Sequence, residues 1–204
     1  MMWTEIDIHI SQVTGKKFNS SQRRSVGGGC INQGYAVSNA EALRYFVKLN
    51  QASQITMFEA EALGLQQMYE TATIRVPKLI CWGTAGSSCY IVLEWLEMGS
   101  GNSKSWEEMG RKLAAMHKWK PLQEEDERFG WKINNTIGST PQINTWTADW
   151  AEFYTKHRLG YQFQLGRRRG GRFPQAEELL KAVGEFLAHH PQPSLVHGDL
   201  WGGN

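Results

Sequence analysis

The feature that most constrains this chain is the stretch from His197 to Asn204, which reads His-Gly-Asp-Leu-Trp-Gly-Gly-Asn. An aspartate stands two residues after the histidine, and an asparagine stands five residues after the aspartate. A carboxylate on such a loop can accept the proton of an attacking hydroxyl, and the later amide oxygen can bind a divalent metal ion. The alternative is a glycine-rich turn that Asp199 merely caps, because short motifs also match by chance.

A lysine and a glutamate upstream could form an ion pair. Lys48 ends an aromatic and β-branched segment, 43–49, which predicts a strand. The predicted helix that follows, 57–71, offers Glu59, Glu61 and Glu70, and Glu61, thirteen residues after Lys48, is in a suitable position for the pair. In protein kinases a strand lysine pairs with a helix glutamate and grips the nucleotide phosphates. Read alone, Lys48 is a solvated charge at a strand end and Glu61 is a partner of the helix dipole.

A glycine-rich segment precedes Lys48 in the chain. It holds Gly27, Gly28 and Gly29, and Gly34 follows. Glycines let backbone N–H groups come close to phosphate oxygens, so we expect Gly28 and Gly29 to contact a nucleotide. The segment matches neither G-x-G-x-x-G nor a Walker A loop, and a flexible turn is the plain alternative.

The predicted elements change character at residues 99–103. The part before this segment reads as antiparallel strands at 35–37, 43–49, 79–83 and 88–94, with the helix at 57–71. We therefore predict an α+β fold of the two-lobed protein-kinase type, with an N-lobe at 1–98 and a truncated, mainly helical C-lobe at 99–204. The linker would hold adenine through the backbone of Glu94, Trp95 and Leu96. An ordinary buried strand end is the alternative for these three residues.

Three helices and a short strand are predicted after residue 99. Ser105 and Glu108 form an apparent capping box at the start of the first helix, and residues 146–157 suggest the second. Pro174 opens the third. Residues 194–197 read as a strand. The predicted buried side of the third helix consists of Leu179, Leu180, Val183, Phe186 and Leu187.

The composition excludes several other classes of protein. A net charge of +2 argues against a nucleic-acid binder held by charge. No apolar run approaches the roughly 18 residues of a membrane span, and no secretory signal is evident. The three cysteines, none in a CxxC pair, suit a reducing cytoplasm better than a disulfide scaffold. We expect a cytoplasmic protein without nucleic-acid or membrane partners.

With these elements in kinase order, the chain resembles the fructosamine/ketosamine-3-kinases, which are relatives of the aminoglycoside and choline kinases. The resemblance rests on sequence blocks at 27–32, 46–50, 57–61, 129–131, 140–144, 149–159 and 197–204. It implies a kinase that uses ATP and Mg²⁺ to phosphorylate the 3-hydroxyl of ketosamines. Such substrates are ribulosamine or fructosamine adducts on protein amines, or free ketosamines, and phosphorylation leads to deglycation and protein repair.

The resemblance also assigns roles to individual residues. It implies that Asp199 is the catalytic base and Asn204 a magnesium ligand. It implies that Lys48, paired with Glu61, holds ATP phosphates. Trp201 would line the sugar pocket with its aromatic face, and a core tryptophan is the alternative.

Cys30 lies inside the glycine-rich segment, where backbone N–H groups can lower the pKa of a thiol. The resemblance supports a redox-sensitive thiol at this position. Our hypothesis is that oxidation links two subunits through a Cys30 disulfide, forming a homodimer with reduced activity. An inert small residue in a turn is the alternative.

One departure from the kinase pattern is serious. Kinases of this fold hold metal through a second aspartate after the catalytic loop, and no acidic residue follows Asn204. We expect a fragment of a longer enzyme. An aminoglycoside- or choline-type small-molecule kinase and a truncated, non-catalytic pseudokinase module are the alternatives.

Overall fold

The computed structural model describes residues 1–27, 31–120 and 128–200 of the 204-residue chain. It divides into two compact units. The first, called the sheet unit here, comprises Met1–Trp119 and the segment from Leu195, and the second, the helical unit, comprises Lys120–Ser194. Antiparallel strands with helices in the first unit confirm the predicted α+β class. The lobe boundary at residue 98 stays a prediction.

Five antiparallel strands form the sheet, in the order β1-β2-β3-β5-β4. Their bounds are β1 Gln22–Val26, β2 Gln33–Ser38, β3 Arg44–Gln51, β4 Leu79–Ala85 and β5 Ser88–Glu94. Four of these strands were predicted. β1 was not, because it is an edge strand whose polar side chains, Arg23 and Arg24 among them, stay exposed. Charged side chains on an edge strand discourage pairing with another chain.

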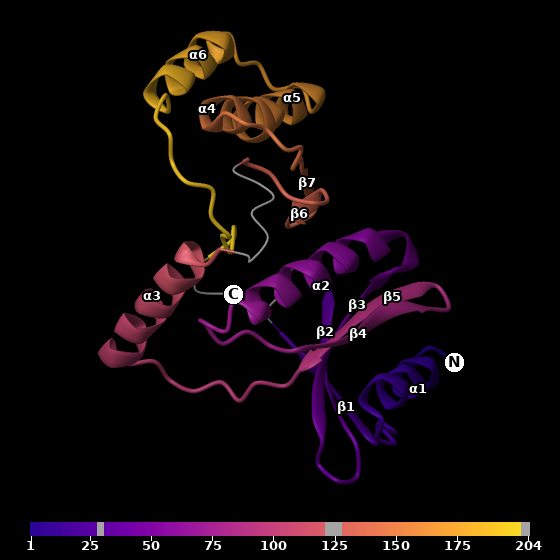
Figure 1. Cartoon of the computed structure of the whole chain (residues 1–204). Coiled ribbons are helices and arrows are strands. Elements are labelled where there is room, and N and C mark those ends of the chain that lie inside the picture. Colours follow the sequence, from indigo (N-terminus) through magenta and orange to yellow (C-terminus); the bar gives the residue numbers. More distant parts are fainter. Residues whose placement is uncertain (28–30, 121–127, 201–204) are drawn as a thin grey trace. The chain divides into compact units, whose positions relative to one another are not determined.

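Two helices cover opposite faces of the sheet (Figure 1): α1, Met2–Thr14, and α2, Ile55–Glu70, which follows a 3₁₀ turn at Ala52–Gln54. Side chains alternate between the faces along each strand. In β3, Val47 packs into the core with α1, whereas Phe46 packs against the core with α2. Lys48 is two residues after Phe46, so the same alternation turns its side chain toward α2.

Helix α1 was missed by the sequence analysis. Ile6, Ile8 and Ile10 alternate with polar residues, which is the period of a strand rather than of a helix. In the structure Ile6 and Ile10 are fully buried one helical turn apart, and Ile8 is 52% exposed on the other side. Tertiary packing against the sheet therefore overrides the local pattern.

Helix α3, Ser103–Lys118, begins three residues earlier than the predicted cap at Ser105 implies. Ser105 is not its N-cap. Asn102 caps the helix instead, because its side chain accepts a hydrogen bond from Ser105 N at 3.0 Å, and Ser105 Oγ accepts one from Asn102 N at 2.7 Å. The capping box is thus Asn-x-x-Ser, and Glu108 takes no part in it.

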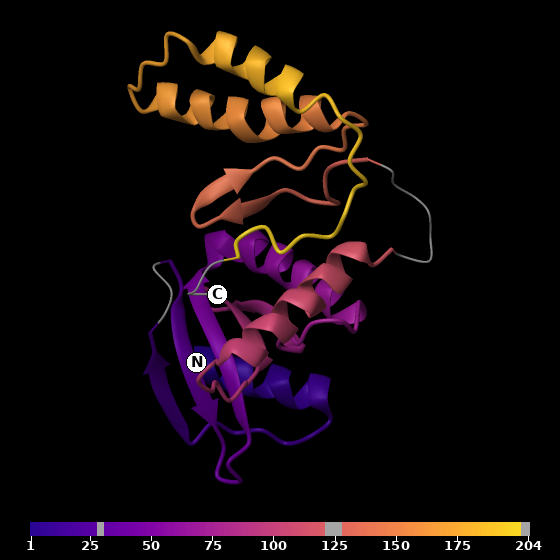
Figure 2. The same ribbon diagram turned by 90° about the vertical axis from the view of Figure 1, so that its left-hand side faces the viewer.

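The helical unit contains a small hairpin and a helical layer. The hairpin pairs β6, Asn135–Ile137, with β7, Thr140–Gln142. In the helical layer, three segments follow one another without a break and α6 packs beside them (Figure 2). These elements are α4 Trp150–Phe153, the π-helix η2 Tyr154–Gly160, α5 Tyr161–Arg168 and α6 Ala176–Phe186.

Three predictions for this half of the chain were wrong. The second helix begins at Trp150 rather than at 146, because Asp149 caps it by accepting a hydrogen bond from Glu152 N at 2.7 Å. Residues 194–197 form no strand, since no ladder partner lies among the described residues. On α6, Leu179 and Phe186 are 47% and 85% exposed, not buried.

No helix in the described ranges is long and apolar enough to cross a membrane.

Candidate active site

The centre of the candidate site is an ion pair between β3 and α2. Lys48 Nζ lies 2.6 Å from Glu61 Oε1, so the pair forms between the two residues whose spacing predicted it. The side chains remain 29% and 25% exposed. An ammonium group has three N–H donors, and Glu61 is the only partner of Lys48 among the described residues. Donors on Lys48 therefore remain for an anionic ligand.

The strand beside Lys48 approaches closely at a glycine. Gly34 on β2 is the register partner of Lys48. A Cβ atom at Gly34 would lie 2.9 Å from the carbonyl oxygen of Val26 and 3.2 Å from the ring of Phe46. A larger side chain would clash there, so glycine lets the end of β1 at Val26 and the start of β2 at Gly34 lie close together beside Lys48. Gly28 and Gly29, which come between β1 and β2 in the sequence, lie outside the described residues.

Asn50 links the same strand to the glycine-rich segment, a connection that the sequence analysis did not find. Its Nδ2 donates to Asn32 Oδ1 at 2.7 Å, and its Oδ1 accepts from the backbone of Gln51 at 2.8 Å. Asn50 stands two residues after Lys48, and so on the same face of β3. That period-two spacing was the signal that could have revealed it.

The proposed adenine-binding segment begins at the end of β5. Glu94 Oε1 pairs with Arg75 Nη2 at 2.6 Å, and Glu94 N donates to the carbonyl oxygen of Lys78 at 2.8 Å. The guanidinium of Arg44 lies 5.4 Å from the ring centroid of Trp95. The buried Nε1 of Trp95 has no acceptor among the described residues. Leu96 follows, half-buried.

The predicted base belongs to the sheet unit, which also contains Lys48. Asp199 is exposed, and its backbone N–H donates to Nδ1 of the half-buried His197 at 3.4 Å. Gly198 between them has φ +83°, a left-handed conformation that favours glycine. The loop geometry thus accounts for the glycine of the His-Gly-Asp motif. Trp201 and Asn204 lie outside the described residues.

The thiols of Cys81 and Cys89 are buried in different cores. Cys81 packs on the α1 face of the sheet and Cys89 on the α2 face, so the sheet separates them. Burial raises the pKa of Cys81 to about 12 and also raises that of Cys89. Both thiols stay protonated and unreactive near neutral pH. Cys30 lies outside the described residues.

A second polar cluster, in the helical unit, joins two of the sequence blocks named above. Asn144, 3% exposed, accepts a hydrogen bond at its Oδ1 from Arg158 Nη2 at 2.8 Å and donates through Nδ2 to Asn135 Oδ1 at 2.8 Å. Arg158 Nη1 also donates to the carbonyl oxygen of Ile143 at 2.5 Å, and its guanidinium lies 4.5 Å from the ring centroid of Phe153. We call Asn144 and Arg158 with these contacts the Asn144–Arg158 network.

Comparison with known proteins places this geometry in a family. The family model for fructosamine kinase matches residues 2–204. The chain belongs to the fructosamine kinase family. A probable ketoamine kinase of Synechocystis sp. is 53% identical to it over 203 residues, which are 99% of this chain and 67% of that protein. A chloroplastic protein-ribulosamine 3-kinase of rice, Oryza sativa subsp. japonica, is 44% identical over 93% of this chain and 56% of its own length.

Solved structures of the fructosamine kinase family share the fold. The crystal structure of a Haemophilus somnus protein assigned as a fructosamine-3-kinase superposes with a TM-score of 0.85 at 26% identity. The superposition covers 95% of this chain and 64% of the other. The chain thus spans between about half and about two thirds of the length of these relatives, and its fold is kinase-like.

Proposed function

We propose that the full-length protein is an ATP-dependent ketosamine 3-kinase that acts on ribulosamine or fructosamine adducts of protein amines. In this reaction Asp199 accepts the proton of the 3-hydroxyl, and the sugar oxygen attacks the γ-phosphorus of ATP. The bond between that phosphorus and the bridging oxygen breaks, so ADP leaves and a 3-phosphoketosamine forms. Elimination of inorganic phosphate from C3 and hydrolysis of the carbon–nitrogen bond by water then release the sugar as a dicarbonyl compound, which restores the free amine of the protein.

The observation that carries this proposal is the Lys48–Glu61 ion pair at the centre of an antiparallel sheet. A lysine held by a helix glutamate, with N–H donors to spare, suits the α- and β-phosphates of a nucleotide. The relatives named as ketoamine and ribulosamine 3-kinases support the choice of substrate. Within the proposal, Gly28 and Gly29 approach the phosphates and Trp201 lines the sugar pocket.

The described residues fit a nucleotide. Lys48 has unused donors, and we assign the backbone of the segment Glu94–Leu96 to adenine. For Mg²⁺, the described residues contain no cluster of three His, Cys, Asp or Glu side chains. Kinase magnesium sites often need only one or two protein oxygens beside the phosphates, and we assign Asn204 as one of them. Bound Mg²⁺ would neutralise charge that develops on the phosphates.

The test uses the full-length protein with ribulosyl-lysine, ATP and Mg²⁺, with phosphorylated product detected by mass spectrometry. We expect turnover that falls about 10³-fold in Asp199→Asn, because proton removal by a base contributes on that order. Choline and an aminoglycoside serve as alternative acceptors. Faster phosphorylation of either one, ATP binding without turnover, or full activity of Asp199→Asn would each refute the proposal.

A reducing compartment such as the cytoplasm suits the free thiols Cys81 and Cys89. Since both are buried, the proposed redox switch and homodimer depend on Cys30. We expect peroxide to produce a dimer on non-reducing gels with the wild type but not with Cys30→Ser. An equal dimer band from both proteins would disprove the switch.

A further inference from the structure

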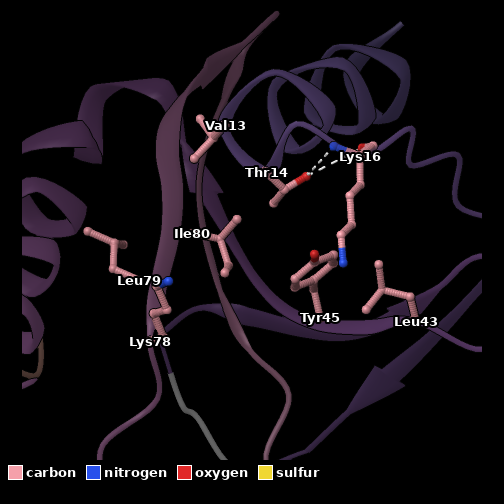
Figure 3. Close-up of a pocket in the computed structure, with 8 residues that line it drawn as sticks. All are labelled: Val13, Thr14, Lys16, Leu43, Tyr45, Lys78, Leu79 and Ile80. Atoms are coloured by element: carbon pink, nitrogen blue, oxygen red, sulfur yellow. Dashed lines mark hydrogen bonds between the residues drawn. The ribbon is translucent and has the colours of Figure 1, made fainter.

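A cavity of about 340 Å³ lies on the α1 side of the sheet, away from the face that carries Lys48 and Glu61. It sits where the end of α1 meets the beginnings of β3 and β4 (Figure 3). Its lining consists of Val13, Thr14, Lys16, Leu43, Tyr45, Lys78, Leu79 and Ile80. None of these residues has a part in the proposed kinase chemistry.

The phenol of Tyr45 is the first sign of a ligand. Tyr45 is 7% exposed, and its ring packs edge-on against Phe18 at a centroid distance of 5.1 Å. Among the described residues its hydroxyl has no hydrogen-bond partner, and Figure 3 shows that hydroxyl pointing toward the end of α1 and Lys16. Burial raises the pKa of Tyr45, so the hydroxyl keeps its proton and can donate it to an acceptor.

Two ammonium groups flank the same cavity. Lys16 follows the last turn of α1, and Lys78 immediately precedes β4. Both side chains are exposed, and neither forms an ion pair with an acidic side chain in the described part of the chain. The nearby carboxylate of Glu94 is already paired with Arg75. The cavity therefore offers two positive charges and one phenolic donor without an anion to satisfy them.

The rest of the wall is aliphatic. Val13, Leu43 and Ile80 supply it with their side chains, whereas the side chain of Leu79 packs on the α2 face of the sheet (Figure 3). Thr14 uses its hydroxyl within α1, where Oγ1 donates to Ile10 O at 2.7 Å. Such a wall favours an apolar body, whereas the lysines and the phenol favour an anionic end. We propose that this cavity binds a small amphipathic anion, a carboxylate or phosphate monoester carried on an apolar body. This site is separate from the proposed kinase site and does not rest on it.

The test measures binding of octanoate and octyl phosphate to the full-length protein by calorimetry, with octanol and inorganic phosphate as partial probes. Tyr45→Phe removes only the hydroxyl and retains the ring, and we expect it to weaken binding about fivefold, the effect of one hydrogen bond. The double variant Lys16→Met/Lys78→Met should weaken binding about tenfold, because two exposed charges are lost. The matched control is Lys17→Met/Lys104→Met, which changes two exposed lysines outside the cavity.

Binding of either octyl anion, with losses confined to the cavity variants and growing weaker with salt, would support the proposal. Chemical-shift changes at the methyl groups of Val13 and Ile80 would place the ligand. Equal affinity for octanol would refute the anionic end, and equal affinity for inorganic phosphate would refute the apolar body. Failure of both octyl anions to bind, or equal losses in the control, would overturn the proposal. Each of these readouts is independent of kinase activity.

Discussion

The Lys48–Glu61 pair and the Asn144–Arg158 network both tie a basic side chain to another element, yet they differ in what they leave unsatisfied. The ammonium of Lys48 has one partner and stays a quarter exposed. The guanidinium of Arg158 contacts two carbonyl oxygens, an amide oxygen and an aromatic face, and no carboxylate among the described residues. Unused donors on a singly bonded ammonium suit ligand binding, whereas a half-buried guanidinium that makes three hydrogen bonds within its own unit suits a structural role.

Electrostatics agrees with this contrast. Burial lowers the pKa of Arg158, because its charge is removed from water, although an arginine remains charged at any pH that proteins meet. Neighbouring His157 also has a lowered pKa, from burial first and then from Lys156 and Arg158. The sequence blocks that the family shares can therefore contain both ligand-binding and structural residues, and only their contacts in the structure distinguish the two kinds.

The largest effect should come from the open pair. Lys48→Met is expected to lower kcat/KM of the full-length protein about 10²–10³-fold, while the free energy of unfolding changes by less than about 1 kcal/mol. The matched control is Lys112→Met, which breaks an exposed pair with Glu108 of the same 2.6 Å length and should leave activity unchanged. Steady-state kinetics and urea denaturation measure the two quantities. If Lys48→Met instead lowered the free energy of unfolding enough to account for the lost activity, Lys48 would have a structural role like that of Arg158.

The Asn144–Arg158 network should show the reverse behaviour. Arg158→Met leaves Asn144 Oδ1 and the carbonyl oxygen of Ile143 without their donor, so we expect the helical unit to lose about 3 kcal/mol of stability. Hydrogen exchange resolved to residues 129–168 would measure this loss locally. The double variant with Asn144→Ala should be less destabilised than the sum of the singles, since the residues share one network. Normal exchange with lost activity would instead make Arg158 part of the chemistry.

The smallest effect should come from Asn50, which is intermediate between the two kinds. Asn50→Ala removes the hydrogen bond to Asn32, so the glycine-rich segment is held less firmly. We expect KM for ATP to rise about fivefold, with kcat within about twofold, because one hydrogen bond contributes about 1 kcal/mol. Asn19→Ala, at an exposed position, is the control. A fall in kcat at constant KM would refute a role in positioning this segment.

Much of the sheet unit was predictable because its strands and α2 follow simple periods. The kinase-like order of the elements and the place of Glu61 in the first turns of its helix indicated the pair with Lys48. The sequence signals failed where tertiary contacts decide: α1 shows the alternation of a strand, and Asn102 rather than Ser105 caps α3. The Asn50–Asn32 bond joins residues eighteen positions apart: the period-two spacing places Asn50 on the same face as Lys48, but it does not specify Asn32 as the partner.

The helical unit was harder to predict for a physical reason. The π-helix Tyr154–Gly160 shifts the helical phase, so the periodicity of α4 does not carry into α5. A Cβ at Gly160 would lie 2.5 Å from the carbonyl oxygen of Thr155, which explains a glycine inside a continuous helix. The exposed Phe186 could not be foreseen either, because an amphipathic pattern shows which side is apolar and not what covers it.

Strand β5 has every residue from Cys89 to Leu93 buried, with α1 on one side and α2 on the other. Successive side chains of β5 point into the two cores alternately, so a substitution at any of these positions must match the volume of the side chain that it replaces in a close-packed core. The sequence of this segment should therefore change slowly in evolution for reasons of packing alone. If these five positions prove invariant among relatives, close packing explains the invariance, and it is no sign of a catalytic role.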